Sequence, residues 1–120
     1  MKFIVAAPEL LEHLIKVNGA IVSKPVLPIL DNFLFDIKKG VLTISTTDLE
    51  TSMSTSLKVE SKEDILVAIP SKLLMDTVKM LNEQPITFTV NEDTYAIELS
   101  TAFGRYKLAG QSGADFPKVP

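Results

Sequence analysis

Residues 33–59, FLFDIKKGVLTISTTDLETSMSTSLKV, decide the fold that we predict for this chain. Phe33, Phe35 and Ile37 occupy every second position, which is the period of a strand that buries one of its faces. The turn-forming residues Lys-Lys-Gly follow at 38–40, and the alternation then resumes. The stretch therefore begins with an antiparallel β-hairpin.

A third predicted strand follows this hairpin. Its larger side chains fall on one face and its smaller polar side chains on the other: the first set is Met53, Thr55, Leu57 and Val59, and the second is Ser52, Ser54, Ser56 and Lys58. This pattern is typical of an antiparallel strand with one face in solvent.

A strand and a helix precede the hairpin. Residues 1–6 predict the strand, and Pro8 then opens the helix at a position where its missing N–H group costs no hydrogen bond. The helix has an apolar stripe and a polar face, which are Leu10, Leu11, Leu14 and Ile15, and Glu9, Glu12, His13 and Lys16. Gly19 is the expected end of the helix.

The second half of the chain repeats this order of elements. We predict a strand over residues 65–69, a helix over 71–81, and three strands over 86–90, 95–99 and 106–108. The helix residues also recur 63 positions later (73 minus 10, for example), since Leu10, Leu11 and Lys16 return as Leu73, Leu74 and Lys79.

The repeated unit predicts an α+β fold with an internal duplication. The repeats cover about residues 1–60 and 61–117 of a single domain, because 120 residues are enough for one core. Each helix has one apolar stripe, so we expect the two helices side by side on one face of antiparallel sheets, with their polar faces outward. The ending at 115–120, DFPKVP, resembles a linker, so the sequence is expected to be part of a longer protein.

Composition limits the classes of function. The chain has no cysteine, which excludes disulfides and thiolate chemistry and fits a cytoplasmic protein. The apolar stretch after Met1 stops at Pro8, too short for a signal peptide or a membrane span, so no membrane partner is expected. The net charge of −3 argues against a protein that binds nucleic acid through a broad basic surface.

The residues also offer little for catalysis. His13 is the only histidine, so neither a Ser-His-Asp triad nor a multi-histidine metal site can form. Asp48 and Glu50 could act as an acid–base or metal pair, but a backbone-capping turn is the better interpretation of Thr47-Asp48. Residues 110–113, Gly-Gln-Ser-Gly, lack the lysine and helix of a phosphate loop and predict a plain loop. We predict no catalytic residue, cofactor or metal.

The chain resembles the bacterial DNA sliding clamps, the β subunits of DNA polymerase III, along its whole length. The segments that carry the resemblance are Met1-Lys2-Phe3, Lys24-Pro25-Val26-Leu27-Pro28-Ile29-Leu30 with Asn32, Thr47-Asp48-Leu49-Glu50, Ile69-Pro70 and Ala114-Asp115-Phe116-Pro117. Each is short, but their order and spacing together are specific.

This resemblance implies that the sequence is the first of three domains in a clamp chain. In the family, two such chains form a ring around duplex DNA. Such a ring gives a replicative polymerase processivity without chemistry of its own, and binds polymerase and clamp loader through later domains. Topology holds it on DNA, so a net negative charge is no obstacle, and only the charge facing the hole matters.

The resemblance and the helical pattern together nominate site residues. Lys16, Lys72 and Lys79 lie on the polar faces of the two helices and are expected to face DNA. Lys24 matches a position where the family places a basic residue on a DNA phosphate. The expected DNA-binding set is therefore Lys16, Lys24, Lys72 and Lys79.

The last strand matches the edge through which the family's first domain pairs with a partner chain. Its residues Arg105, Tyr106, Lys107 and Leu108 are the expected subunit interface. Tyr106 and Leu108 could equally be core residues. Ala102 and Phe103 depart from the basic residues that the family often places there, so these two positions cannot form the salt bridges that the family makes across the interface.

One alternative from another class of function is a domain that binds a small ligand in a pocket between helices and sheet. Few polar groups converge there, which disfavours it. Met75 and Met80 are expected to fill the core.

Overall fold

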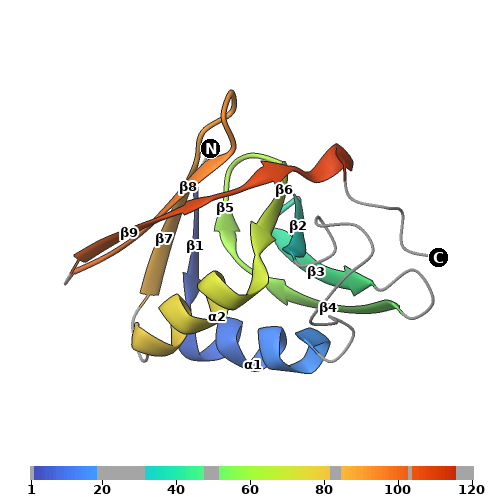
Figure 1. Cartoon of the computed structure of the whole chain (residues 1–120), viewed down its shortest axis with the longest axis horizontal. Coiled ribbons are helices and arrows are strands. Elements are labelled where there is room, and N and C mark those ends of the chain that lie inside the picture. Colours follow the sequence, from blue (N-terminus) through green and yellow to red (C-terminus); the bar gives the residue numbers. More distant parts are fainter. Residues whose placement is uncertain (1, 19–31, 48–51, 82–84, 103, 116–120) are drawn as a thin grey trace.

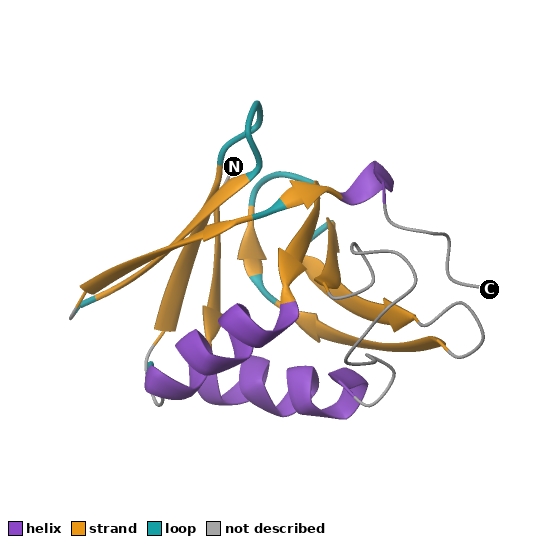
Figure 2. Cartoon of the chain, viewed as in Figure 1, coloured by secondary structure: helices purple, strands orange, loops and turns teal. Residues whose placement is uncertain are grey.

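The structure of the chain is a computed structural model, and it describes residues 2–18, 32–47, 52–81, 85–102 and 104–115. Lys24, Asp48 and Glu50 lie outside these ranges, as does most of the predicted linker. Two helices lie next to each other under two sheets (Figures 1 and 2).

The elements follow the predicted order of strand, helix and three strands, twice. The first set is β1 (Lys2–Ala6), α1 (Ala7–Val17), β2 (Asn32–Lys38), β3 (Val41–Thr47) and β4 (Ser52–Lys58), followed by the short β5 (Glu60–Ser61). The second is β6 (Ile65–Pro70), α2 (Ser71–Met80), β7 (Pro85–Val90), β8 (Ala96–Thr101) and β9 (Gly104–Ala109), followed by β10 (Gln111–Ser112) and a 3-10 turn at Gly113–Asp115. The predicted α+β fold class is confirmed.

The two halves exchange their first strands. The first sheet has the order β5-β1-β7-β8-β9, and the second has the order β10-β6-β2-β3-β4. Strand β1 therefore joins the strands of the second half, and β6 joins those of the first, each in antiparallel register. Each half completes the other's sheet.

Apolar side chains from both halves fill the space between the sheets and helices. The rings of Phe3 on β1 and Phe88 on β7 stack with centroids 4.6 Å apart, and Phe35 on β2 packs against both at 6.2–6.3 Å. All three are fully buried, as are Leu10 of α1 and Leu74 of α2. The core is therefore one cluster shared by both sheets.

The buried residues of the helices correct the predicted register of the repeat. Leu10, Leu14 and Val17 correspond in burial to Leu74, Val78 and Leu81, each 64 positions later (74 minus 10). The sequence alignment at 63 pairs Leu10 with Leu73, but Leu73 is 54% exposed. Ile15, which we predict in the apolar stripe, is 56% exposed. The offset of 63 matches residues of the same type, whereas burial depends on the angular position of a residue around the helix.

Two further predictions about local structure are wrong. Residues 110–113 are not a plain loop, since Gln111 and Ser112 form β10 and pair with Val67 and Ala68 of β6. Tyr95 lies outside β8, and its φ angle is 61°. A two-residue strand has too few side chains to give a periodic signal.

Gly110 is required where the chain crosses from β9 to β10. Its N–H donates to the Tyr95 carbonyl, with the nitrogen and oxygen 3.1 Å apart. A β-carbon at this position would lie 2.5 Å from the same oxygen and 2.7 Å from Cδ1 of Ile97.

We expect Gly110→Ala to lower the free energy of unfolding by about 1–3 kcal/mol, the usual cost of overpacking.

Urea denaturation followed by circular dichroism measures this change. Gly104→Ala is the matched control, because its β-carbon would meet nothing closer than 3.8 Å. Equal unfolding midpoints for the two variants would show that the crossing tolerates a side chain.

Candidate nucleic-acid interface

The outer faces of α1 and α2 form the first candidate surface, which we call the helix face. Both helices bury one side against the core and leave the other in solvent (Figure 1). The charged residues of this face, all exposed, are Glu9, Glu12 and Lys16 on α1 and Lys72, Asp76 and Lys79 on α2. Three carboxylates thus accompany three lysines, and the face has no net charge.

The three lysines differ in their surroundings. Lys16 Nζ lies 3.7 Å from the Glu12 carboxylate, in an exposed pair one helical turn apart. Lys72 and Lys79 have no ion pair among the described residues. They are seven residues apart, so they point to the same side of α2 about 10 Å from each other along the helix axis. The structure thus places three of the four predicted DNA-binding lysines on one surface, and Lys24 lies outside the described residues.

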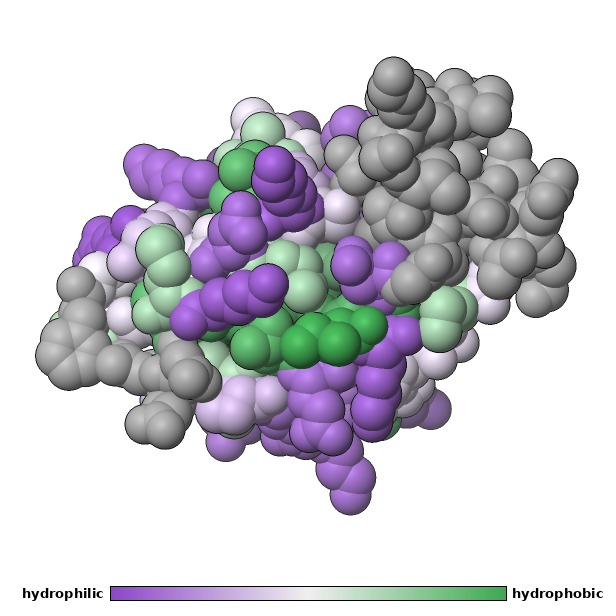
Figure 3. Space-filling model, turned by 60° about the horizontal axis from the view of Figure 1, so that its bottom comes forward, coloured by the Kyte–Doolittle hydropathy of each residue, from purple (hydrophilic) through white to green (hydrophobic). Residues whose placement is uncertain are grey.

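Apolar side chains also reach this surface. Ile15, Leu73 and Met80 are exposed by 56%, 54% and 65%, and Met80 is therefore not the core residue that we predicted. Met75 is partly buried against the core, as predicted. The space-filling view of this side shows green apolar groups running between purple charged ones (Figure 3). The helix face offers few contiguous groups for holding a phosphate backbone.

A buried hydrogen bond anchors the end of α1 on the sheet. The Thr46 hydroxyl of β3 donates to the carbonyl oxygen of Val17, the last residue of α1, over 2.6 Å. This oxygen would otherwise be an unsatisfied group at the helix terminus.

His13 lies on the same helix, with Nδ1 2.8 Å from the Glu9 carbonyl oxygen. The interaction of this histidine is local to the helix.

Strand β9 forms the second candidate surface, because it is the last strand of the first sheet. Arg105 and Lys107 point outward, and Arg105 Nε lies 3.8 Å from the Glu98 carboxylate on β8. Tyr106 and Leu108 point to the other side: Tyr106 packs against the core, and Leu108 is only 8% exposed. The structure therefore splits the four predicted interface residues between two faces of one strand.

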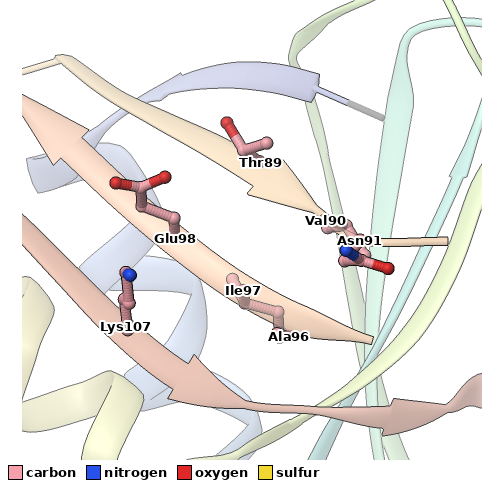
Figure 4. A pocket seen from close by; sticks show the side chains of 7 residues that line it. All are labelled: Thr89, Val90, Asn91, Ala96, Ile97, Glu98 and Lys107. Carbon is pink, nitrogen blue, oxygen red and sulfur yellow. The ribbon is translucent and has the colours of Figure 1, made fainter. Parts of the chain in front are cut away.

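A shallow hollow of about 450 Å³ lies on the first sheet near this strand. Thr89, Glu98 and Lys107 project from three neighbouring strands along one side of it (Figure 4). The hollow is open to solvent, whereas buried core side chains fill the space between helices and sheets that the small-ligand alternative requires for its pocket. The small-ligand alternative is not favoured.

The described residues provide neither a metal-binding cluster nor a membrane-spanning helix. No group of three or more histidine, aspartate or glutamate side chains in the described part of the chain could hold a metal ion. Among the same residues, no helix has both the length and the apolar composition needed to cross a bilayer.

The hydrogen bond from Thr46 to the Val17 carbonyl gives a testable prediction about the stability of the domain. Thr46→Val keeps the side-chain shape and leaves the Val17 carbonyl without its partner, so we expect the free energy of unfolding to fall by about 1–3 kcal/mol. Thermal unfolding followed by calorimetry measures the change. Thr87→Val, on the half-exposed side of β7, is the matched control, and an equal effect there would exclude a specific role for the anchor.

Comparison with known proteins assigns the family. Residues 1–120 match the family described as "DNA polymerase III beta subunit, N-terminal domain". The "Beta sliding clamp" of Vibrio harveyi is 31% identical over 99% of this chain and 82% of that protein. The "Beta sliding clamp" of Haemophilus influenzae is 31% identical over 99% of this chain but only 32% of that protein.

Solved structures agree with this assignment. The crystal structure of the DNA polymerase III subunit beta from Pseudomonas aeruginosa has a TM-score of 0.89 and 29% identity, over 100% of this chain and 32% of that one. A putative DNA polymerase III beta subunit from Eubacterium rectale, at 22% identity, shares the fold with a TM-score of 0.94 and is covered over 33% of its length. These findings confirm the resemblance drawn from the sequence: the chain belongs to the DNA polymerase III beta subunit family, and it matches the N-terminal domain of that family.

Proposed function

We propose that this chain is the first domain of a sliding clamp whose full-length parent encircles duplex DNA. The observation that carries the proposal is the helix face, where two neighbouring helices present lysines on one side of a domain whose sheets lie on the other. In such a ring, helix faces from successive domains would line the hole. The three lysines of α1 and α2, together with Lys24, would meet the phosphate backbone.

The charges of the helix face suit a clamp that slides. Each phosphate contact that releases counterions adds to affinity and to its salt dependence. A face with three lysines and three carboxylates gains little affinity in this way. The ring would hold DNA by topology, and the weak face would let it move.

The edge strand β9 supports the second part of the proposal, a homodimeric ring. An unpaired strand edge offers backbone groups to a strand of a partner chain. Arg105 and Lys107 would lie at the rim of that interface, while Tyr106 and Leu108 would support the strand from the core side. The backbone of Arg105–Leu108 and its two outward basic side chains would form the contact.

The proposed partners are duplex DNA, a replicative DNA polymerase and a clamp loader, the last two bound through domains beyond this chain. The proposed role is processivity without catalysis, in the cytoplasm and without a membrane partner or a cofactor. This domain alone would not close a ring.

A primer-extension assay with a polymerase, a clamp loader and the full-length parent tests the proposal. The length of DNA made in one binding event of the polymerase should rise when the parent is present and stay unchanged with residues 1–120 alone.

The lysines give a direct test of the helix face. We expect the double variant Lys72→Ser, Lys79→Ser to bind duplex DNA more weakly and to lower the log–log salt slope by about 0.9 for each phosphate that the variant no longer binds. Fluorescence anisotropy at several salt concentrations measures both quantities. Lys58→Ser with Lys62→Ser makes the same change in net charge on exposed residues of the sheet side. If both double variants bind DNA equally weakly, DNA does not approach the helix face.

The outward residues of β9 give a test of the ring interface. In the full-length parent, Arg105→Glu with Lys107→Glu should weaken the dimer about tenfold, since charge reversal at a rim costs about 1.4 kcal/mol in total. Sedimentation equilibrium measures the dimer constant. Lys58→Glu with Lys62→Glu is the control, and an equal weakening there would place the interface elsewhere.

A further inference from the structure

We propose that Glu12 and Asp76 keep the DNA contact of the helix face weak, so that the clamp can slide. This inference rests on the proposed function and assigns two residues to the control of its DNA contact. Their carboxylates would repel phosphate and compete for the lysines beside them. They would lower the affinity of the lysine contacts without being ligands of DNA themselves.

The first support is their equivalent position in the two halves. Burial relates the helices by 64 positions, as the pairs Leu10 with Leu74 and Leu14 with Val78 show. The same offset relates Glu12 to Asp76 (76 minus 12). Both side chains are exposed and lie opposite the buried stripe of their helix, where an approaching duplex would come closest. The lysines do not repeat, because Lys16 and Lys79 correspond at this offset to Met80 and Ile15.

The second support is the place of each carboxylate among the lysines. On α1, Glu12 is the ion-pair partner of Lys16, at 3.7 Å. On α2, Asp76 lies four residues after Lys72 and three before Lys79, so all three point to the same side of the helix. Asp76 thus separates the two lysines that have no ion pair among the described residues. A phosphate that reached both lysines would also meet this carboxylate.

The other face of the domain supplies matched controls. Glu92, in the turn after β7, and Glu63, before β6, are exposed acids without an ion pair among the described residues. Glu92→Gln and Glu63→Gln remove one negative charge each, as Glu12→Gln and Asp76→Asn do. An increase in affinity that comes only from net charge would be equal in all four variants.

A nuclear magnetic resonance titration of the 120-residue chain with a 12-base-pair duplex tests the inference, because amide shifts report both affinity and location. We expect Asp76→Asn and Glu12→Gln each to raise affinity about threefold at low salt, the effect of lifting one repulsion across about 7 Å of water. Glu12→Gln should also steepen the salt slope by up to about 0.9, since it frees Lys16. The two control variants should match the unchanged chain.

The outcomes separate the inference from the proposed function. Shifts on α1 and α2 with equal affinity in all variants would overturn the inference and leave the proposed function standing. An equal increase in affinity in test and control variants would also overturn it, as an effect of net charge alone. Shifts confined to the sheet side would overturn the proposed function as well. Thermal unfolding checks that the exposed substitutions leave the fold unchanged.

Discussion

The pairing of each half's first strand with the other half is the constraint on which the structure depends. Strand β1 pairs with β7 over five residues from Lys2 to Ala6, and β6 pairs with β2 from Ile65 to Pro70. The stacked rings of Phe3 and Phe88 lie on the first of these seams. Because each sheet needs a strand from the other half, neither half could bury its own core.

This exchange also positions the helices. Each helix follows the exchanged strand directly, since α1 begins at Ala7 after β1 and α2 begins at Ser71 after β6. The exchange therefore brings both helices to the same side, where their apolar stripes meet one core. Their outer faces become one surface, which carries charged groups from both halves. The balance of charge on this surface results from the fold and not from either helix alone.

The edge strand β9 has two differently placed sets of side chains. The alternation of side chains along β9 sends Arg105 and Lys107 outward and Tyr106 and Leu108 to the core side. The strand can thus be held firmly by its own domain while its outer backbone edge faces away. In the ring that we propose, such a firm edge would lose little conformational freedom on pairing with a partner chain.

The sequence by itself determined the number, type and order of the main elements. Alternation at Phe33, Phe35 and Ile37 and the helical stripe of Leu10 and Leu14 are local signals, because the period of a side-chain pattern follows from backbone geometry. The ordered motifs also identified the family. The exposure of Lys16, Lys72 and Lys79 on polar helix faces followed from the same periodicity.

Only the tertiary structure decided which strands pair, which register relates the helices and which apolar residues stay exposed. Strand exchange, the offset of 64 and the pairing of β10 with β6 join residues that are far apart in the chain, so no local pattern reports them. Ile15, Leu73 and Met80 resemble core residues in a helical pattern, but they lie outside the angular sector of each helix that packs against the core, and all three are exposed. Burial is a property of the assembled layers, whereas periodicity belongs to a single element.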